Sequence, residues 1–227
     1  MSDLADRLAE VDGRIADAAR AAGRDPAELT RIVVTKFHPA SLVRELHALG
    51  VRDVGENRHQ EAAAKAGELA DLDDLRWHFV GQLQSNKAQA VRRYAATVHS
   101  VDRESLVRAL SAREGDASVL GCFLELDLSG EPGRGGVDPG AAERLAEQVL
   151  AAPGLELLGV MAVAPLGADP RPAFARVRET SERIRRIAPG ATAISAGMSG
   201  DFADAIAEGA THLRIGTAIT GKRSTAG

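Results

Sequence analysis

Short apolar runs alternate with helical patterns along the whole 227-residue chain, and this alternation restricts its fold more than any other feature. The apolar runs cover residues 31–36, 52–56, 77–80, 97–99, 119–126, 155–163, 192–194 and 212–215. Helical patterns follow the first seven of these eight runs. Such runs between amphipathic helices indicate a parallel sheet covered by helices. The pattern predicts an α/β fold, a single (β/α)8 TIM barrel whose functional groups lie on the loops after the strands.

A further helix is expected before the first strand. Its apolar positions recur at helical spacing, at Leu4, Leu8, Val11, Ile15 and Ala18. Because the pattern stops at Gly23, we expect residues 1–22 to form this helix and to pack on the barrel, with residues 1–227 as one domain. The alternative fold is a doubly wound open sheet. It is disfavoured because no strand is followed by the nucleotide-binding patterns G-x-G-x-x-G or G-x-x-x-x-G-K-[ST].

The charge balance argues against two classes of partner. With 28 Lys and Arg against 32 Asp and Glu, the formal net charge is −4, so no general basic field exists to collect nucleic acid or an anionic membrane. Residues 157–168, the longest uncharged apolar stretch, are too few to span a bilayer, and the N-terminus lacks a signal-peptide pattern. The single cysteine, Cys122, lies in an apolar run and is expected to be buried in a reducing compartment. We therefore expect a cytoplasmic protein.

The first candidate site residue is Lys36, which ends the first apolar run. At the mouth of an apolar barrel, burial would favour the neutral amine, which can form a Schiff base. A solvated lysine in a loop is an equally good interpretation of its position. Sequence position alone leaves both interpretations open.

Two further candidate segments follow the last two strands. Residues 195–201, Ser-Ala-Gly-Met-Ser-Gly-Asp, and residues 214–217, Arg-Ile-Gly-Thr, offer hydroxyl and backbone N–H groups. TIM barrels often bind phosphate at these two loops. The structural alternative for the first segment is capping of a helix by Ser199 or Asp201. A Schiff-base lysine combined with a phosphate site suggests either pyridoxal 5′-phosphate or a phosphosugar aldolase.

Several motifs together resemble a known family. They are Val-Thr-Lys at 34–36, Gly-Glu-Asn-Arg at 55–58, Gln-Glu at 60–61, Trp-His-Phe-Val-Gly-Gln-Leu-Gln-Ser-Asn-Lys at 77–87, Ser-Ala-Gly-Met-Ser-Gly-Asp-Phe at 195–202 and Arg-Ile-Gly-Thr-Ala-Ile at 214–219. In this order they are similar to the pyridoxal phosphate homeostasis protein family and, more distantly, to the barrel domain of alanine racemase. The resemblance covers essentially the whole chain.

The resemblance implies a role for each site residue. Lys36 would carry pyridoxal phosphate as a Schiff base, and Asn57 would lie beside the cofactor. Arg214 would meet the pyridine nitrogen. The phosphate would be held by Ser199, Gly216 and Thr217.

Three departures from the family pattern are visible. Ala196 stands where many members have methionine, and Thr220 where phenylalanine is common. Arg134 stands where a lysine is common, so no role of that lysine is carried over. Arg134 belongs to a glycine-rich connection, residues 129–138, expected to be a mobile loop at the strand ends.

The same residues argue for a cofactor carrier rather than an enzyme. A racemase needs a base on each face of the substrate, but the only tyrosine, Tyr94, is expected on the outer helix after the third strand. Only residues 222–227 remain after Gly221, where alanine racemases have a second domain. An arginine at the pyridine nitrogen can only donate, which weakens the ring as an electron sink.

The expected function is thus binding of pyridoxal phosphate for vitamin B6 homeostasis, without turnover. The protein is expected to be a monomer, with pyridoxal-phosphate-dependent apo-enzymes as candidate partners. The alternative is a racemase-like enzyme with Lys36 as base, and a third hypothesis is a Schiff-base aldolase. His78 and His99 are expected to be hydrogen-bonded barrel residues. No histidine or cysteine spacing suggests a metal site.

Overall fold

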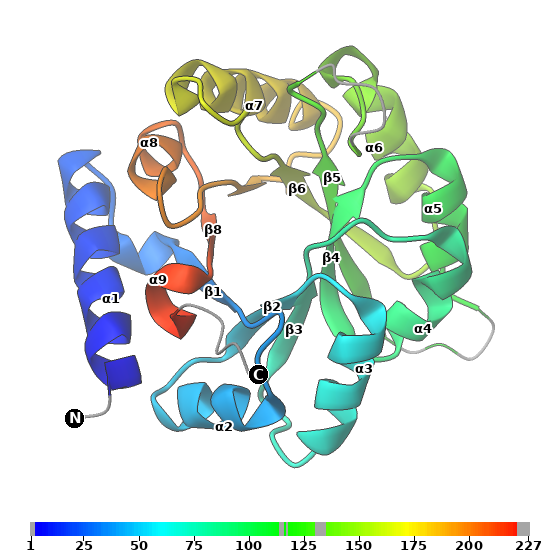
Figure 1. Ribbon diagram of the computed structural model, residues 1–227. Coiled ribbons are helices and arrows are strands. Elements are labelled where there is room, and N and C mark those ends of the chain that lie inside the picture. Colours follow the sequence, from blue (N-terminus) through cyan, green and yellow to red (C-terminus); the bar gives the residue numbers. More distant parts are fainter. Residues whose placement is uncertain (1–2, 114–115, 117, 130–134, 222–227) are drawn as a thin grey trace.

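The computed structural model describes residues 3–113, 116, 118–129 and 135–221, and within them eight parallel strands close into a barrel (Figure 1). The strands are β1 (Thr30–Val34), β2 (Asp53–Glu56), β3 (Arg76–Phe79), β4 (Ala95–Val101), β5 (Leu120–Glu125), β6 (Leu155–Met161), β7 (Ala193–Ser195) and β8 (His212–Ile215). Each strand pairs with the next, and β8 pairs with β1 through the register Val33 to Ile215. The predicted TIM barrel is confirmed.

Helices surround the barrel on its outer side (Figure 1). They are α1 (Asp3–Ala21), α2 (Ala40–Ala48), α3 (His59–Glu68), α4 (Ala88–Arg92), α5 (Glu104–Leu110), α6 (Ala142–Leu150), α7 (Pro170–Ile184), α8 (Phe202–Ala207) and α9 (Thr217–Thr220). Their buried faces follow helical periodicity, as in α6, where Ala142, Leu145, Ala146 and Val149 are all buried. This periodicity is why most helices could be predicted.

Two elements differ from the expectation. The sequence predicts no helix after the last strand, but α9 follows β8 there. The helix expected over residues 85–94 begins as a 3-10 turn, Ser85–Lys87, and α4 ends at Arg92, so Tyr94 lies in the turn before β4. Both elements are too short to show a hydrophobic period.

The N-terminal helix α1 lies beside α8 and α9 (Figure 1). Its buried residues are Leu4, Leu8, Val11, Ile15 and Ala19. Two side chains from this region also bond the main chain of the last units, because Arg7 Nε donates to the Ile219 carbonyl (2.7 Å) and Arg24 Nη1 to the Ala210 carbonyl (2.6 Å). These two bonds join the N-terminal segment to the chain just before and just after β8.

One glycine is required by the close approach of two strands. Gly159 in β6 has φ +153°, and a Cβ atom there would lie 1.8 Å from the Ala193 carbonyl oxygen of β7. Any other side chain at this position would push β7 away from β6 and open the barrel beside Ser195.

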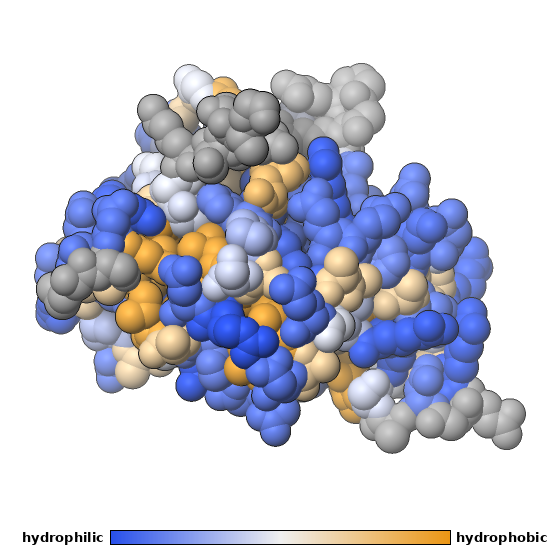
Figure 2. Space-filling view, turned by 60° about the horizontal axis from the view of Figure 1, so that its bottom comes forward, coloured by the Kyte–Doolittle hydropathy of each residue, from blue (hydrophilic) through white to orange (hydrophobic). Residues whose placement is uncertain are grey.

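Polar residues cover most of the face shown in Figure 2, where hydrophobic residues form small groups between them. Cys122 is fully buried, as expected for a packing residue. In the described part of the chain, no helix is long and apolar enough to cross a membrane. Residues 130–134 of the glycine-rich connection, including Arg134, lie outside the described residues, so its mobility stays a prediction.

Candidate functional site

Lys36 lies in the loop after β1, two residues beyond the last strand residue. Its side chain is exposed, which agrees with the solvated-lysine interpretation and not with a buried amine. The next residue, Phe37, has φ +67°, a left-handed conformation that is unusual for a bulky side chain. Such strain costs about 1–3 kcal/mol and is typical of functional loops. The loop that presents the Lys36 amine therefore has a strained backbone position directly beside it.

A buried ion pair fixes the base of this loop. Lys65 of α3 donates from Nζ to Glu56 Oε1 (2.6 Å) and to the Thr35 carbonyl (2.9 Å). The Thr35 hydroxyl donates to the same Glu56 oxygen (2.7 Å). Lys65 and Glu56 are 7% and 1% exposed. Because Thr35 immediately precedes Lys36, this pair anchors the backbone from which Lys36 projects.

Asn57 follows β2, and its Oδ1 atom is buried with no hydrogen-bond partner within the described structure. The backbone of Gly81, after β3, packs directly against it. A Cβ atom at Gly81 would lie 2.3 Å from the Asn57 carbonyl oxygen. A buried acceptor without a hydrogen bond lowers the stability of a folded protein, so we infer that Oδ1 is available to accept from a bound group.

The loops after β7 and β8 carry the remaining rim residues. Ser199 lies in the turn before α8, and Gly216 and Thr217 begin α9. Capping does not explain Ser199 or Asp201. Asp201 makes no side-chain capping bond to α8, and its carboxylate accepts from the Met198 N–H instead (2.6 Å). Gly216 also leaves α9 without a side-chain cap. The first turn of α9 is thus free of a capping side chain, as a phosphate site requires, whereas the N–H groups of Asp201 and Phe202 at α8 donate to the Met198 carbonyl (3.2 and 3.0 Å).

Arg214 is the buried cation of the site. Its Nη1 donates to the Ser195 carbonyl and to Ser195 Oγ (both 2.7 Å), and its Nη2 to the Ala162 carbonyl (2.9 Å). Burial lowers the pKa of Arg214 to about 10, although the charges of Glu125 and Asp201 oppose this shift. All three acceptors are neutral. A buried guanidinium that is hydrogen-bonded only to neutral groups favours an electron-rich ligand beside it.

The barrel topology brings these residues to one sector of its rim. β7, β8, β1 and β2 are consecutive neighbours in the closed barrel. Ser199, Gly216, Lys36 and Asn57 follow their carboxyl ends in that order, and Arg214 lies within β8. The six residues proposed from sequence thus lie around four adjacent strands.

Sequence reasoning gave no role to Glu56 or Lys65, and it placed Ser195 in a candidate phosphate segment rather than beside Arg214. A signal for Lys65 existed, because it lies three residues after Ala62 and four before Leu69, on the buried face of α3. Nothing local pointed to its pairing with Glu56.

The other sequence expectations can be compared with the structure directly. His78 and His99 are hydrogen-bonded inside the barrel, as expected. Tyr94 lies in the turn before β4, with its ring stacked on His59 at 5.9 Å. Among the residues described, no group of three or more histidines, cysteines or carboxylates is arranged to hold a metal.

His212, in β8, makes the stability of the fold depend on pH. Burial lowers the pKa of His212 to about 4. The unfolded chain therefore binds a proton here more readily, and stability is full above pH 6.5 and lost as the pH falls towards 4. From about pH 7.5 to about pH 5 we expect His212 to account for ~2 kcal/mol of lost stability. Urea unfolding at both values checks this, with His212→Gln as the variant whose loss is smaller by that amount. An equal loss in the variant would contradict the assignment.

The family described as alanine racemase, N-terminal domain, matches residues 13–224. A protein of Pseudomonas aeruginosa named pyridoxal phosphate homeostasis protein is 44% identical over 227 residues, 98% of this chain and 97% of its own. A protein of the same name from Mycobacterium tuberculosis is 42% identical over 241 residues, 98% of this chain and 93% of its own. The chain belongs to this family.

Solved structures agree with the family. PipY of Synechococcus elongatus, solved without pyridoxal phosphate, is 36% identical with a TM-score of 0.85, over 96% of this chain and all of PipY. PipY with the cofactor bound gives 35% and 0.81 over the same shares. An alanine racemase of Corynebacterium glutamicum is 17% identical, with a TM-score of 0.69 over 96% of this chain and 62% of the racemase, which shows a shared fold alone. The family resemblance seen in the sequence is confirmed.

Proposed function

We propose that this protein binds pyridoxal 5′-phosphate at the rim of β7, β8, β1 and β2 and takes part in the homeostasis of that cofactor. The observation that carries the proposal is Arg214, a buried guanidinium held by neutral acceptors in the same sector as the exposed amine of Lys36. The unpartnered Oδ1 of Asn57 fits a bound polar group at the same place. The relatives' name and the cofactor bound to PipY support the same ligand.

Each residue then has a stated task. Pyridoxal phosphate supplies an aldehyde carbon that a lysine amine can bond as a Schiff base. Lys36 is the amine for this bond, because its side chain is exposed on a fixed loop. Ser199, Gly216 and Thr217 donate hydroxyl and backbone N–H groups to the phosphate. Arg214 donates to the pyridine nitrogen, and Asn57 accepts from a group beside the ring.

We propose further that the protein holds the cofactor without turnover. A guanidinium can only donate, so Arg214 keeps the pyridine nitrogen unprotonated and the ring a poor electron sink. The single tyrosine, Tyr94, lies in the turn before β4 and stacks on His59, so it offers no second base at the rim. The rival function is a racemase-like enzyme with Lys36 as base. Racemisation of L- or D-amino acids by the loaded protein at rates typical of enzymes would decide for it.

The remaining proposals concern the setting of this function. We propose that the protein acts in the cytoplasm as a monomer and delivers pyridoxal phosphate to apo-enzymes. Sedimentation of the loaded protein tests the monomer, and activation of an apo-enzyme across a fast mixing experiment tests delivery. If the loaded protein activates the apo-enzyme no faster than free pyridoxal phosphate does, the cofactor is released into solution before the enzyme binds it.

The decisive experiment maps the modified lysine. Purified protein is mixed with pyridoxal phosphate, reduced with borohydride and digested, and the labelled peptide is identified by mass. We expect the label on Lys36. Labelling of Lys65, or no label at all, would overturn the assignment. A lysine that is labelled only after a carbonyl substrate is added would instead support the aldolase hypothesis.

Removing a phosphate donor should weaken cofactor binding without unfolding the protein. Ser199→Ala and Thr217→Val each delete one donor to a dianion, for which a loss of ~1.5–3 kcal/mol, roughly tenfold or more in Kd, is expected. Equilibrium titration followed by absorbance measures this. Pyridoxal, which lacks the phosphate, is the matched ligand, and its affinity should be unchanged. Equal weakening for both ligands would mean that the phosphate does not bind at these loops.

A further inference from the structure

A chain of hydrogen bonds crosses the barrel interior from Arg214 to the amino-terminal ends of the strands. Ser195 Oγ contacts Arg214 Nη1 at 2.7 Å and His99 Nδ1 at 2.9 Å. His99 Nε2 contacts His78 Nδ1 at 2.9 Å, and His78 Nε2 contacts Asp53 Oδ1 at 2.9 Å. These members come from β8, β7, β4, β3 and β2, and all five are buried.

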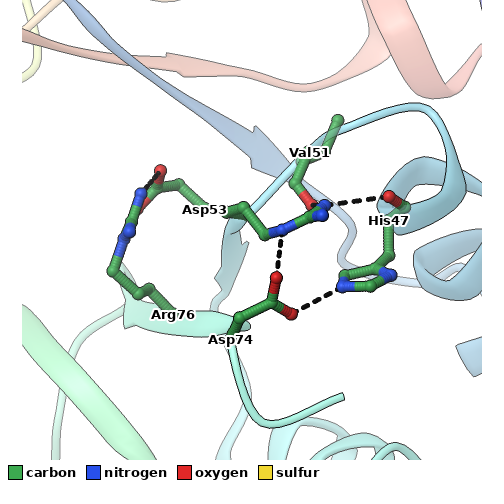
Figure 3. A network of polar contacts seen from close by, with 6 residues as sticks. His47, Val51, Asp53, Asp74 and Arg76 are labelled. Carbon is green, nitrogen blue, oxygen red and sulfur yellow. Dashed lines mark hydrogen bonds and ion pairs between the residues drawn. The ribbon is translucent and has the colours of Figure 1, made fainter.

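The chain ends on a second arginine at the opposite face. Arg76 holds both oxygens of Asp53, with Nε to Oδ1 at 2.7 Å and Nη2 to Oδ2 at 2.6 Å (Figure 3). Asp53 and Arg76 line a cavity of about 420 Å³, and the Arg76 side chain is 58% exposed. The chain therefore connects the solvent-facing foot of the barrel to the guanidinium at its rim.

The carboxylate at the foot fixes the direction of every bond. Burial opposes ionisation of Asp53, but the hydrogen bonds from Arg76 and His78 outweigh it and lower the pKa of this carboxyl. An ionised carboxylate only accepts, so His78 Nε2 carries a proton. Because Arg76 already balances the charge of Asp53, a charged His78 would be an excess buried cation. In neutral His78, Nδ1 must then accept from His99 Nε2–H.

The rim end requires the same direction. Burial lowers the pKa of His99 well below its usual range, so this ring is neutral. With its proton on Nε2, His99 Nδ1 accepts from the Ser195 hydroxyl. That leaves the lone pairs of Ser195 Oγ for Arg214, which only donates. If every hydrogen bond ran in the opposite direction, His99 Nδ1–H would donate to Ser195 Oγ, the oxygen that also accepts from Arg214. The hydroxyl proton of Ser195 would then have lost His99 Nδ1 as its acceptor.

We propose that His78 and His99 are positioning residues that act through Ser195 to hold the Arg214 guanidinium, and that Asp53 sets the direction of the chain from the far side of the barrel. The proposal rests on the proposed function in one respect, that Arg214 faces the cofactor ring. The order of protons in the chain is a property of the polypeptide itself and exists without any ligand.

The first test determines which ring nitrogen of His78 and of His99 carries a proton in the cofactor-free protein. Long-range ¹H–¹⁵N correlation spectra of the histidine rings at neutral pH distinguish the two neutral forms from the charged one. We expect both His78 and His99 to be neutral and protonated on Nε2. An Nδ1 proton on either ring, or a charged His78, would overturn the proposed direction.

The second test changes the foot of the chain and has a matched control on the same face. Asp53→Asn replaces one carboxylate oxygen by an amide NH2 group. When this group faces His78 it donates a hydrogen bond, so His78 Nε2 must accept and cannot carry a proton. We expect a detectable Nδ1-protonated form of His78 and His99. Asp74 pairs with Arg52 and His47 beside this site but touches no member of the chain (Figure 3). Asp74→Asn should leave both ring spectra unchanged, and an equal effect of the two variants would refute a specific role of Asp53.

The third test asks whether the chain matters to the ligand. Ser195→Ala removes one hydrogen bond to a charged group and should raise the Kd for pyridoxal phosphate about tenfold or more, with Asp53→Asn raising it in the same direction. His212→Gln changes a histidine of the same barrel that lies outside the chain and should not change it. Unchanged affinity in Ser195→Ala and Asp53→Asn, with Lys36 still labelled in the wild type, overturns the positioning role while the proposed function stands. Failure of the wild type to bind pyridoxal phosphate overturns both.

Discussion

Replacing Lys36 with alanine should abolish covalent capture of pyridoxal phosphate. The wild-type protein mixed with the cofactor is expected to show the visible absorption band of a Schiff base, and the variant is expected to show none. Lys65 cannot substitute easily, because its Nζ is bonded to Glu56 and to the Thr35 carbonyl at the base of the loop. A visible spectrum of each protein, before and after borohydride, is the measurement. An unchanged band in Lys36→Ala would contradict the assignment.

The control for this result must separate lost chemistry from lost structure. Since the Lys36 side chain is exposed, its truncation should change the free energy of unfolding by no more than about 0.5 kcal/mol. Non-covalent affinity for the phosphate loops should also persist in part. Lys87→Ala, a lysine of the 3-10 turn after β3, is the matched substitution and should keep the full absorption band.

The fold could be predicted because its repeated unit is visible in short windows of sequence. β1 is a run of β-branched residues, with Ile32 and Val33 fully buried, and α2 after it shows its apolar period in Ala40, Val43 and Leu46. Each unit buries one face against its neighbours, so local pattern and global topology agree. The elements missed or misjudged, α9 and α4, are short enough that tertiary contacts rather than periodicity decide them.

The site could be predicted only in part, and for a related reason. The rim residues lie within motifs at strand ends, where the barrel rule says that functional groups gather. The supports of those residues are long-range pairs, such as His99 with Ser195, which are 96 positions apart. A single sequence, considered without its relatives, does not show which distant residues pair. For the same reason the sequence leaves open whether Lys36 is buried or solvated, and the fold shows that it is exposed.

The buried pair Lys65–Glu56 should make the second large difference, to stability. Lys65→Met removes the cation but leaves the Glu56 carboxylate 1% exposed, with only the Thr35 hydroxyl as a hydrogen-bond donor. Breaking a buried ion pair in this way costs ~3–5 kcal/mol. Urea unfolding followed by the fluorescence of Trp77, the only tryptophan, measures the loss. The exposed pair Arg108–Glu104 is the comparison, and Arg108→Met should cost less than about 0.5 kcal/mol.

Removing both charges tests whether the pair serves stability or the position of Lys36. In the double variant Glu56→Gln, Lys65→Met no charge is left buried, so much of the lost stability should return. The Thr35 carbonyl still lacks the Lys65 donor, however, and the loop before Lys36 has lost its anchor. We therefore expect the double variant to fold well but to form the Schiff base more slowly than the wild type. Recovery of both stability and rate would show that the loop needs no support from Lys65, and a single variant as stable as the wild type would show that the pair is not buried in solution.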